Sequence, residues 1–423
     1  MFAGNAFGGD RLWLLTLCAA RVGSAAPFQV YAGVLPYVQT EWSMSGSEAG
    51  VLAFAWQVVF AVSLVVLSWM ADRVGARGVF VWSTWATVVA TALVALLAHS
   101  FDSGLLLFSL LALVNGGTYT PGLMLLARFP SARRGVAIGW FLGAASLGYA
   151  LALGIIGSLV RAGGWRGAVF AIAGFGGALA AVTTPSLMRG SAAPDTSAVQ
   201  RSPSSAGIVR GFLMNRSALL ITVGYSFHAW ELLGMWVWTP AFLTAVLASR
   251  PAAAEVSGLG VGLSALFHLM GLAASGAAGW LSDRWGRSAV IIAMLVVSGM
   301  CSFGFGWMIA APLGLVLGVG IIYSFSAIGD SAVFSTGFTE LVDHRILGVS
   351  FAVRSVAGFG AGGVASWLFG VVLDWASKGA VTEQHYAWGW SFSALGAGAV
   401  VAILATVWLR ALPESRRMAE GRR

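Results

Sequence analysis

The chain reads Gly279-Trp-Leu-Ser-Asp283-Arg284-Trp-Gly286-Arg287 at a short charged turn between two long apolar runs. A second copy, Ser68-Trp-Met-Ala-Asp72-Arg73-Val-Gly75-Ala-Arg77, lies upstream between another pair of apolar runs. The two aspartates are 283 − 72 = 211 residues apart, which is half of the 423-residue chain. A glycine allows so short a connection to reverse direction, and the acid and the bases can hydrogen-bond the adjacent helix ends. The spacing therefore predicts a chain made of two repeated halves.

The composition places the chain in a membrane. Hydrophobic residues make up 58% of it, charged residues only 9%, and the mean hydropathy is +0.84, so a soluble fold could not cover this much apolar surface. The formal net charge is +8, but the basic residues stand singly between apolar runs, which argues against nucleic-acid binding and is typical of membrane-protein loops. Cys18 and Cys301 lie inside apolar runs, so we expect neither a disulfide nor a metal site.

Apolar runs long enough to cross a bilayer, which takes ~20 helical residues, recur along the chain. We predict twelve crossings, at 12–37, 48–70, 79–98, 104–127, 135–160, 167–188, 217–247, 257–281, 289–310, 313–338, 347–373 and 388–409. The first run, with Arg11 before it and Ser24-Ala25-Ala26 within it, also resembles a cleaved secretory signal. Cleavage would leave eleven crossings and break the correspondence between the halves, so we assign this run as the first helix.

The distribution of charge predicts the orientation of the crossings. The twelve-span topology puts 18 of the 24 Lys and Arg residues on the side shared by both termini. The opposite loops keep only Arg161, Arg166, Arg250 and Lys378, and two arginines remain inside spans. Because basic loops stay in the cytoplasm, we predict a multi-pass protein of the cell (inner or plasma) membrane with both termini cytoplasmic.

Three segments organise the chain. Residues 1–188 and 216–423 hold six spans each, and 189–215 is a long polar stretch, rich in Ser and Pro, that is typical of a flexible cytoplasmic linker. The basic C-terminal tail, with Arg416-Arg417 and Arg422-Arg423, is expected to lie against anionic lipid headgroups.

The charged turns carry a resemblance to a known family. The pattern G-x-x-x-D-R-x-G-R between two spans, present twice, resembles the cytoplasmic loop signature of the major facilitator superfamily of secondary transporters. The downstream copy matches in full, whereas the upstream copy has Ser68 for the first glycine and Ala76-Arg77 where the basic residue is expected. Arg133-Arg134-Gly135, at the start of the fifth span, is similar to the same region of many members. The resemblance implies an all-α integral membrane fold of twelve transmembrane helices in two pseudo-symmetric six-helix bundles. Spans one, four, seven and ten would line a central cavity, with contributions from two, five, eight and eleven.

One enzyme motif misleads. Gly358-Phe-Gly360-Ala-Gly362-Gly363 contains the G-x-G-x-x-G of dinucleotide-binding loops, but it lies inside an apolar run with no predicted strand before it. Close helix packing explains these glycines better. The sequence contains no Walker loop, H-E-x-x-H or G-x-S-x-G pattern, so we expect no enzyme activity, no cofactor and no bound metal.

Polar residues inside the spans indicate where the chemistry lies. A charge at bilayer depth costs at least ~2.5–3.5 kcal/mol on insertion scales, yet Arg21, Glu231, Asp330 and Arg354 all lie well inside spans. They are joined there by Gln29, Gln57, Asn115, His228 and His268. All nine lie on helices that the resemblance places around the cavity, and the four outer helices carry none. We therefore expect a polar cavity.

The two buried arginines predict an anion site. Arg21 and Arg354 come from opposite halves, each roughly 10–14 Å deep at ~1.5 Å per residue, and two facing guanidinium groups can clamp a small anion. Arg354 has an alternative role as the structural partner of Asp330, whereas Arg21 has no acid on its own helix. The predicted substrate-binding residues are Arg21, Arg354, Gln29, Tyr31, Gln57, Asn115, Tyr119 and His268. His268 is either a hydrogen-bond donor or a titrating group.

Proton coupling needs groups inside the protein that take up and release protons. Glu231 and Asp330 are carboxyl groups withdrawn from water, and His228 lies three residues before Glu231 and so shares a helix face with it. We assign these three residues to proton coupling. The alternative for Glu231 is a carboxylate held permanently by a neighbouring donor.

The loop signatures imply a separate role in gating. In the superfamily, the acid of each signature braces the cytoplasmic end of a helix in the other half and holds the inner gate shut. By this resemblance, Asp72 would face Arg345 at the start of the eleventh helix, and Asp283 would face Arg133 and Arg134 at the start of the fifth. The gating residues are Asp72, Arg73, Gly75, Asp283, Arg284, Gly286, Arg287, Arg133, Arg134 and Arg345.

The sequence favours proton-coupled secondary transport of a small organic anion, most simply a carboxylate, by a monomer working through alternating access and symport. Oxalate, formate and monocarboxylate carriers of the superfamily also place basic residues in the cavity. The alternative is proton-driven efflux of drug-like or cationic compounds, with Glu231 and Asp330 attracting the cargo. The Gly-Pro pair that such exporters carry in the fifth helix is absent from Gly148-Tyr-Ala-Leu-Ala-Leu-Gly154. The expected partners are the substrate, protons and the lipid bilayer, with no nucleic acid.

Overall fold

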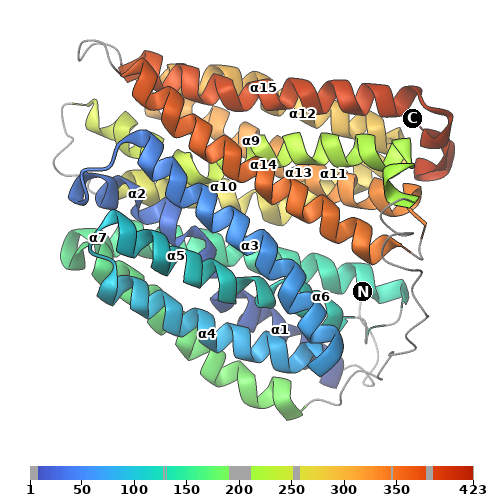
Figure 1. Cartoon of the computed structure of the whole chain (residues 1–423), viewed down its shortest axis with the longest axis horizontal. Helices are drawn as coiled ribbons and strands as arrows, with labels where there is room; N and C mark the ends of the chain where they lie inside the picture. The colour runs from blue at the N-terminus through green and yellow to red at the C-terminus, as the bar shows by residue number, and fades with distance from the viewer. Residues whose placement is uncertain are drawn as a thin grey trace.

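The computed structural model (Figure 1) describes residues 8–126, 129, 131–189, 211–250, 258–343, 346–377 and 384–422. Within these ranges, ten helices are long and apolar enough to cross a membrane. One of them, α7 (Ser131–Arg189), is broken at Gly164, where φ is 64°, and makes two crossings. The first crossing is made of three pieces, α1 (Gly8–Ala25), η2 (Ala26–Gln29) and α2 (Val30–Glu41). With these two additions, the ten become the twelve crossings that the sequence predicts.

The other crossings follow the predicted order. They are α3 (Gly46–Val74), α4 (Ala76–Leu97), α5 (Phe101–Asn115) with η3 (Gly116–Thr118) and α6 (Thr120–Leu125), α9 (Arg216–Ala248), α10 (Leu259–Leu269) with α11 (Gly271–Trp285), α12 (Arg287–Phe305) with η6 (Gly306–Met308), α13 (Leu313–Leu341), α14 (Leu347–Ala376) and α15 (Gln384–Ala411). The first and fourth crossings, predicted as single runs, each contain a 3-10 segment. Pro27 is the second residue of the segment in the first crossing, where it removes a backbone donor. Gly116 and Gly117 begin the segment in the fourth crossing, where glycine weakens the helix.

The two charged turns share one backbone conformation. Gly75 and Gly286 have φ angles of 97° and 91°, in a region that glycine enters without steric cost. Each glycine ends one helix and precedes the next, between α3 and α4 and between α11 and α12. The glycines therefore allow the short reversal that the sequence predicts, once in each half.

The crossings form two groups in space. Figure 1 shows α1–α7 on one side and α9–α15 on the other, with both ends of the chain at the same end of the molecule. We call the opposite end the far end. Residues 190–210, most of the predicted linker, lie outside the described residues, so the domain boundaries at 188 and 216 stay predictions. The cytoplasmic placement of the termini also stays a prediction.

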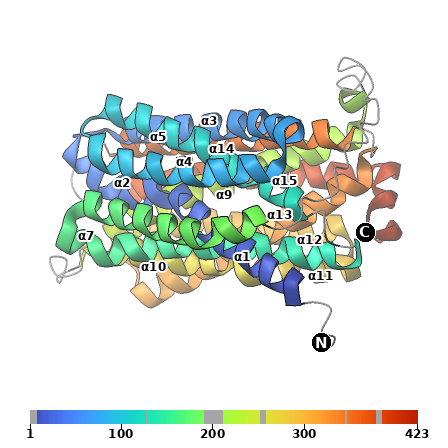
Figure 2. The same ribbon diagram turned by 90° about the horizontal axis from the view of Figure 1, so that it is seen from below.

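Glycines bring the two groups into close contact at the far end. A Cβ added at Gly50 of α3 would lie 2.7 Å from the Cα of Trp367 in α14. At the second seam, between α7 and α10 (Figure 2), a Cβ added at Gly157 would lie 2.6 Å from the Cα of Gly262. Both separations are shorter than a side chain tolerates, so these helices meet backbone to backbone, as small residues allow in membranes.

The seam between α3 and α14 also carries a polar contact. Asp374, near the end of α14, accepts hydrogen bonds from the backbone N–H groups of Gly46 and Ser47 at 2.6 and 2.7 Å. These are the first two residues of α3, whose N–H groups have no partner within the helix. The carboxylate thus caps a helix of the other group and favours its positive end.

The glycines that resemble a nucleotide-binding loop lie inside α14 and pack against α9. A Cβ added at Gly358 would lie 2.6 Å from Tyr225, and one at Gly362 would lie 2.5 Å from Leu233. The described residues before them, from Leu347 onward, are helical. Helix packing is therefore the role of this stretch, as the sequence indicates.

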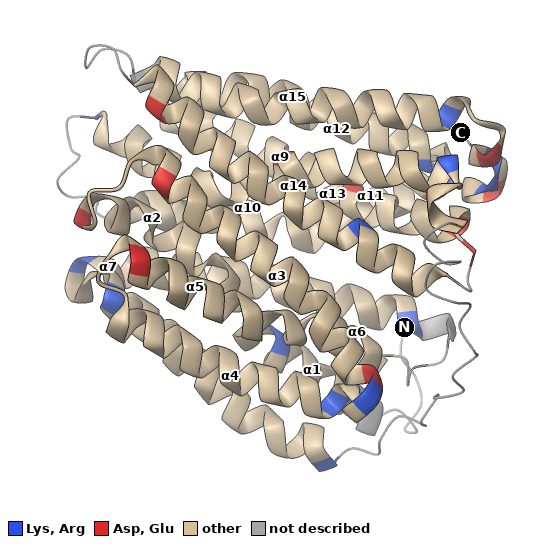
Figure 3. Ribbon diagram, viewed as in Figure 1, with Lys and Arg blue, Asp and Glu red and all other residues tan. Residues whose placement is uncertain are grey.

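Most charged residues lie at the two ends of the molecule, and only a few lie between them (Figure 3). The C-terminal segment η8 (Pro413–Gly421) folds back onto the second group, where Met418 is buried. The backbone N–H of Ala419 donates to Glu340 at 3.0 Å. The tail is thus held by α13, and its predicted contact with lipid headgroups stays a prediction.

Candidate functional site

Arg21 is buried inside the first group of helices, with 3% of its surface exposed. One terminal nitrogen donates to the carbonyl oxygen of Thr118 at 3.2 Å and to its hydroxyl at 2.9 Å. The guanidinium carbon lies 5.4 Å from the ring centre of Tyr119 and 5.3 Å from that of Phe141, within cation–π range. The Nε atom has no hydrogen-bond partner, and Arg21 forms no ion pair with the described residues. Among the described residues, the positive charge of Arg21 therefore has no counter-ion.

Arg354 of α14 is likewise buried, in the second group of helices, and has nitrogen atoms without hydrogen-bond partners. It is 4% exposed and donates one hydrogen bond, to the hydroxyl of Ser335 at 2.9 Å. Its guanidinium carbon lies 3.9 Å from the ring centre of Tyr225, and both Nε and one terminal nitrogen have no partner. The ion pair with Asp330, considered from the sequence, is not formed, because Asp330 contacts a histidine instead.

The two arginines share a tyrosine between the groups. Tyr119 lies within electrostatic range of both Arg21 and Arg354, and also of Tyr225 and Tyr149. One guanidinium from each half of the chain is therefore an electrostatic neighbour of Tyr119, and the clamp between the two arginines stays a prediction. Unpartnered N–H groups and the absence of a facing carboxylate among the described residues make the region suited to an anion.

His228 and Asp330 form a buried pair inside the second group. The Nδ1 atom of His228 lies 2.9 Å from a carboxylate oxygen of Asp330, and its Nε2 lies 2.6 Å from the hydroxyl of Ser331. Ser335, the partner of Arg354, donates its hydroxyl hydrogen to the carbonyl oxygen of Ser331 at 2.9 Å. A chain of polar contacts therefore joins the pair to Arg354.

Glu231 lies beside this pair and points into the second group. Its side chain is 1% exposed, and one carboxylate oxygen accepts a hydrogen bond from Ser298 of α12 at 3.0 Å. The other oxygen has no hydrogen-bond partner. Asp330 and Tyr323 are further electrostatic neighbours. The three residues predicted for proton coupling thus lie on α9 and α13 of a single bundle, and their role in proton coupling stays a prediction.

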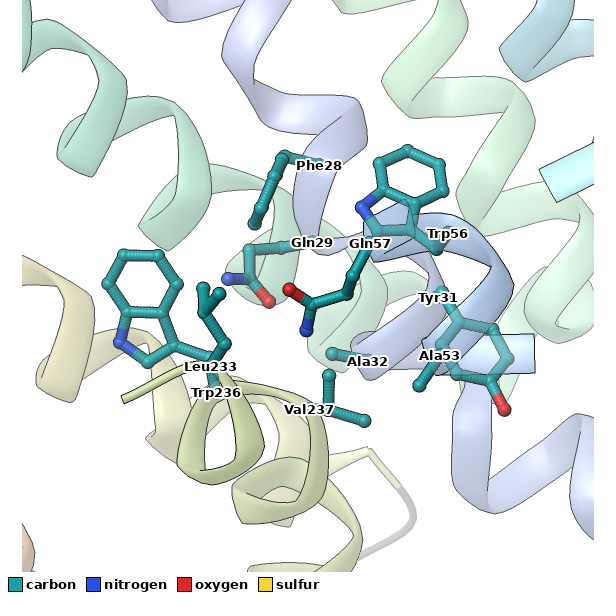
Figure 4. Close-up of a pocket in the computed structure, with 10 residues that line it drawn as sticks. All are labelled: Phe28, Gln29, Tyr31, Ala32, Ala53, Trp56, Gln57, Leu233, Trp236 and Val237. Carbon is teal, nitrogen blue, oxygen red and sulfur yellow. The ribbon is translucent and has the colours of Figure 1, made fainter. Parts of the chain in front are cut away.

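The two predicted glutamines line a separate small cavity of about 20 Å³ (Figure 4), which has room for about one water molecule. Gln57 donates to the hydroxyl of Ser366 in α14 at 3.4 Å. Tyr31 also lines the cavity, but its hydroxyl donates to the carbonyl oxygen of Ala49 at 2.5 Å. The predicted substrate-binding residues are therefore divided between two levels, the arginine region and this cavity.

Two further predicted residues lie near these levels. Asn115 donates to the carbonyl oxygen of Ser24 at 2.7 Å and so braces the end of α5 against the first crossing. The ring of His268 lies 5.0 Å from that of Trp236 and 5.8 Å from that of Tyr149. Tyr149 is also within range of Arg21, so aromatic side chains connect the cavity to the arginine region.

Sequence reasoning missed Tyr149, and with it Thr118, Ser298 and Ser335. A tyrosine at bilayer depth on a helix expected to contribute to the cavity is a signal that could have found Tyr149. The hydroxyl residues carried no such signal, because Ser and Thr inside membrane helices commonly bond to their own backbone, as Thr222 and Thr239 do here.

The gating residues make contacts within their own groups. Asp283 pairs with Arg287 at 2.5 Å, and Arg287 also pairs with Glu340 at 3.0 Å. Arg73 and Arg284 stack on Trp69 and Trp280, 3.9 and 3.8 Å from the ring centres, which repeats one arrangement in both halves. Arg134 donates to the carbonyl oxygen of Phe129. Arg345 and the side chain of Arg133 lie outside the described residues, so the braces between halves stay predictions.

Comparisons with known proteins agree with this architecture. The family model described as Major Facilitator Superfamily matches residues 17–364. A protein of Cupriavidus pinatubonensis (strain JMP 134 / LMG 1197), named "Probable 4-methylmuconolactone transporter", is 26% identical over 351 residues, which cover 79% of this chain and 78% of that protein.

Solved structures of transporters share the fold. A bacterial homologue of the human lysosomal transporter Spinster, inward-facing and unoccupied, has a TM-score of 0.75 at 15% identity and covers 100% of this chain and 99% of its own. A D-xylose–proton symporter has a TM-score of 0.74 at 17% identity and covers 96% of this chain and 99% of its own. The nucleoside transporter NupG has a TM-score of 0.70 at 15% identity, covering 95% and 99%.

Proposed function

The chain belongs to the major facilitator superfamily, and from that premise we propose that it carries a small organic anion, recognised by its carboxylate, in symport with protons. The protein is a secondary transporter and a multi-pass membrane protein. The proposal adds three things to this family membership: the class of substrate, the coupling ion and the residues that bind them.

The observation that carries the proposal is a pair of buried arginines that form no ion pair within the part of the chain that the structure describes. A buried charge that keeps no partner is costly, and Arg21 and Arg354 both keep unpartnered N–H groups around Tyr119. A carboxylate entering between them would accept charge-assisted hydrogen bonds from both halves of the chain. Binding would then also draw the two bundles together, as alternating access requires.

The polar chain behind Arg354 supports coupling to protons. Arg354 reaches His228 and Asp330 through Ser335 and Ser331. An anion at Arg354 changes the field at this pair, because electrostatic interactions are strong where water is excluded. A proton taken up by His228, Asp330 or the neighbouring Glu231 would offset the negative charge that the substrate brings in.

The name of the relative supports the same class of substrate, since 4-methylmuconolactone is a small organic compound of the carboxylate-bearing kind. Export of cations is less well supported. It needs carboxylates that face the path, whereas Asp330 contacts His228 and Glu231 accepts from Ser298 inside one bundle.

Uptake into proteoliposomes under an imposed pH gradient tests the proposal, with carboxylates compared against their methyl esters. Arg21→Gln and Arg354→Gln keep polar groups of similar reach and remove the charge. A hydrogen bond to a charged group contributes about 1.5–3 kcal/mol, so each variant should lose roughly 10- to 100-fold in apparent affinity. Arg166→Gln is the matched control, since Arg166 pairs with Glu41 at the far end. Wild-type transport by both arginine variants, together with uptake of a cation, would refute the proposal.

We also propose that both termini face the cytoplasm and that the monomer is the working unit. The proposed orientation is supported by the 18 of 24 basic residues assigned to the terminal side. A C-terminal tag should resist protease in intact cells and become cleavable after permeabilisation. Cleavage in intact cells would reverse the orientation.

A further inference from the structure

Aromatic rings surround the guanidinium group of Arg354. Its central carbon lies 3.9 Å from the ring centre of Tyr225, and 4.9 and 5.1 Å from those of Phe351 and Phe338. A ring attracts a cation through its electron-rich face but carries no net charge. A carboxylate in the same place would offset the charge of the arginine. The rings therefore hold the guanidinium group and leave its positive charge available to a ligand.

A glycine makes room for the ring nearest to Arg354. Gly358 lies four residues after Arg354 in α14, and a Cβ added there would lie 2.6 Å from a ring carbon of Tyr225 in α9. Two non-bonded carbon atoms normally stay about 3.5–4.0 Å apart. The position of the Tyr225 ring therefore depends on the missing side chain at Gly358.

The first group of helices repeats this arrangement around Arg21. Phe141 of α7 is fully buried, and its ring centre lies 5.3 Å from the guanidinium carbon of Arg21. A Cβ added at Gly122 of α6 would overlap the ring of Phe141. In both halves of the chain, a ring that contacts a buried arginine is thus packed against a glycine of another helix.

The ring of Tyr225 restricts the direction in which Arg354 offers its N–H groups. These groups lie in the plane of the guanidinium, whereas the guanidinium carbon lies over the ring. One terminal nitrogen donates to Ser335, and Nε and the other terminal nitrogen have no hydrogen-bond partner. Without the ring, the long side chain would gain other rotamers. An anion would then have to order the side chain when it binds.

We propose that Tyr225 is a positioning residue for Arg354, and Phe141 for Arg21. Each ring holds its arginine in the orientation that binds the anion and leaves the charge of the arginine intact. The inference rests on the proposed function and adds the residues that keep the two arginines ready for a carboxylate.

The affinity of the purified full-length protein for benzoate tests the inference, with uncharged methyl benzoate as the comparison. Tyr225→Leu removes the ring and should weaken benzoate binding roughly 2- to 10-fold, because ordering a freed side chain costs affinity. Tyr225→Phe keeps the ring and should rescue the binding. Gly358→Ala should resemble Tyr225→Leu, because the added methyl group displaces the ring. A loss of the same size in Tyr225→Phe, or wild-type affinity in Tyr225→Leu, would overturn the inference.

Phe242→Leu is the matched control for lost packing. Phe242 is a fully buried residue of the same helix, and its ring packs against those of Phe305 and Trp388. This variant should bind benzoate like the wild type. A loss as large as that in Tyr225→Leu would assign the effect to packing and overturn the inference.

A double-mutant cycle separates positioning from other effects of the ring. Arg354→Gln should weaken benzoate binding, and Tyr225→Leu added to it should cause little further loss, because no guanidinium group remains to be positioned. Equal losses in both backgrounds would overturn the inference. Phe141→Leu with Arg21→Gln provides the same cycle in the first group, in case Tyr225→Leu does not elute as a folded protein in size-exclusion chromatography.

Thermal unfolding without ligand repeats the cycle independently of benzoate. The shifts in midpoint caused by Tyr225→Leu and Arg354→Gln should be non-additive, because each variant removes the same contact. Additive shifts would overturn the inference. If Arg354→Gln weakens benzoate binding and Tyr225→Leu does not, the positioning role fails and the anion proposal stands. If both arginine variants bind benzoate like the wild type while the midpoint shifts are non-additive, the anion proposal fails and the rings still support the arginines.

Discussion

Removing the carboxylate of Asp374 should shift the protein towards a state open at the far end. Asp374 accepts from the N–H groups of Gly46 and Ser47 at 2.6 and 2.7 Å and joins the two bundles there. Hydrogen bonds to a charged group contribute about 1.5–3 kcal/mol each, and we discount the pair to about 2 kcal/mol because Asp374 is partly exposed. That free energy corresponds to roughly a 30-fold change in the equilibrium. A far-end-open population of about 1% would rise to about 23% in Asp374→Ala.

Distances between spin labels at the far end measure this shift. Leu97 of α4 and Leu315 of α13 are exposed on opposite bundles, so cysteines there, with Cys18 and Cys301 replaced by serine, report their separation. Glu41→Gln is the matched control, because Glu41 is a far-end carboxylate whose partner, Arg166, belongs to the same bundle. Identical distance distributions in wild type and Asp374→Ala, or an equal shift in Glu41→Gln, would refute the reasoning.

Three further outcomes are expected. Asp330→Asn should abolish uphill uptake driven by a pH gradient but retain counterflow, in which external labelled substrate exchanges for unlabelled substrate inside the vesicle. Loss of both activities in a folded variant would count against a role limited to proton coupling. Gly157→Val should hinder closure of the far end, because a Cβ there would lie 2.6 Å from the Cα of Gly262. Spin-label distances across the far end should therefore lengthen, and unchanged distances would contradict this expectation. The hydrogen bonds from Arg166 lower the pKa of Glu41, so the stabilisation by this pair is present above the unfolded-state pKa of the carboxyl group and is lost as the pH falls through the lowered one. Thermal unfolding of Glu41→Gln should therefore be less pH-dependent than that of wild type in the acidic range, and parallel pH profiles would exclude the pair as a source of stability.

The sequence was sufficient for the scaffold because membrane crossings are dictated by local properties. Length and apolarity locate the helices, and Gly75 and Gly286 indicate the two sharp reversals, since few other residues enter that backbone region. The two buried arginines could also be identified from the sequence, because a charged side chain inside a membrane span is costly and usually has a function.

The direction of each buried side chain was not visible. A membrane helix is apolar both towards lipid and towards its neighbours, so periodicity does not reveal which face meets which helix. The sequence therefore offered Arg354 as a partner for Asp330, whereas the rotation of α9 brings His228 to it. It also grouped Gln29 and Gln57 with the arginines, whereas both glutamines line a separate cavity together with residues of α9.

The two contacts between the bundles at the far end, α3 with α14 and α7 with α10, differ in kind. We expect this difference to decide which contact opens first. Between α7 and α10 the described glycines touch through backbone alone, so the surfaces can roll apart without stranding a polar group. Between α3 and α14, two N–H groups must exchange a carboxylate for water before anything moves. We therefore expect the bundles to separate first between α7 and α10 and later between α3 and α14. The first external water should enter along α7 and α10.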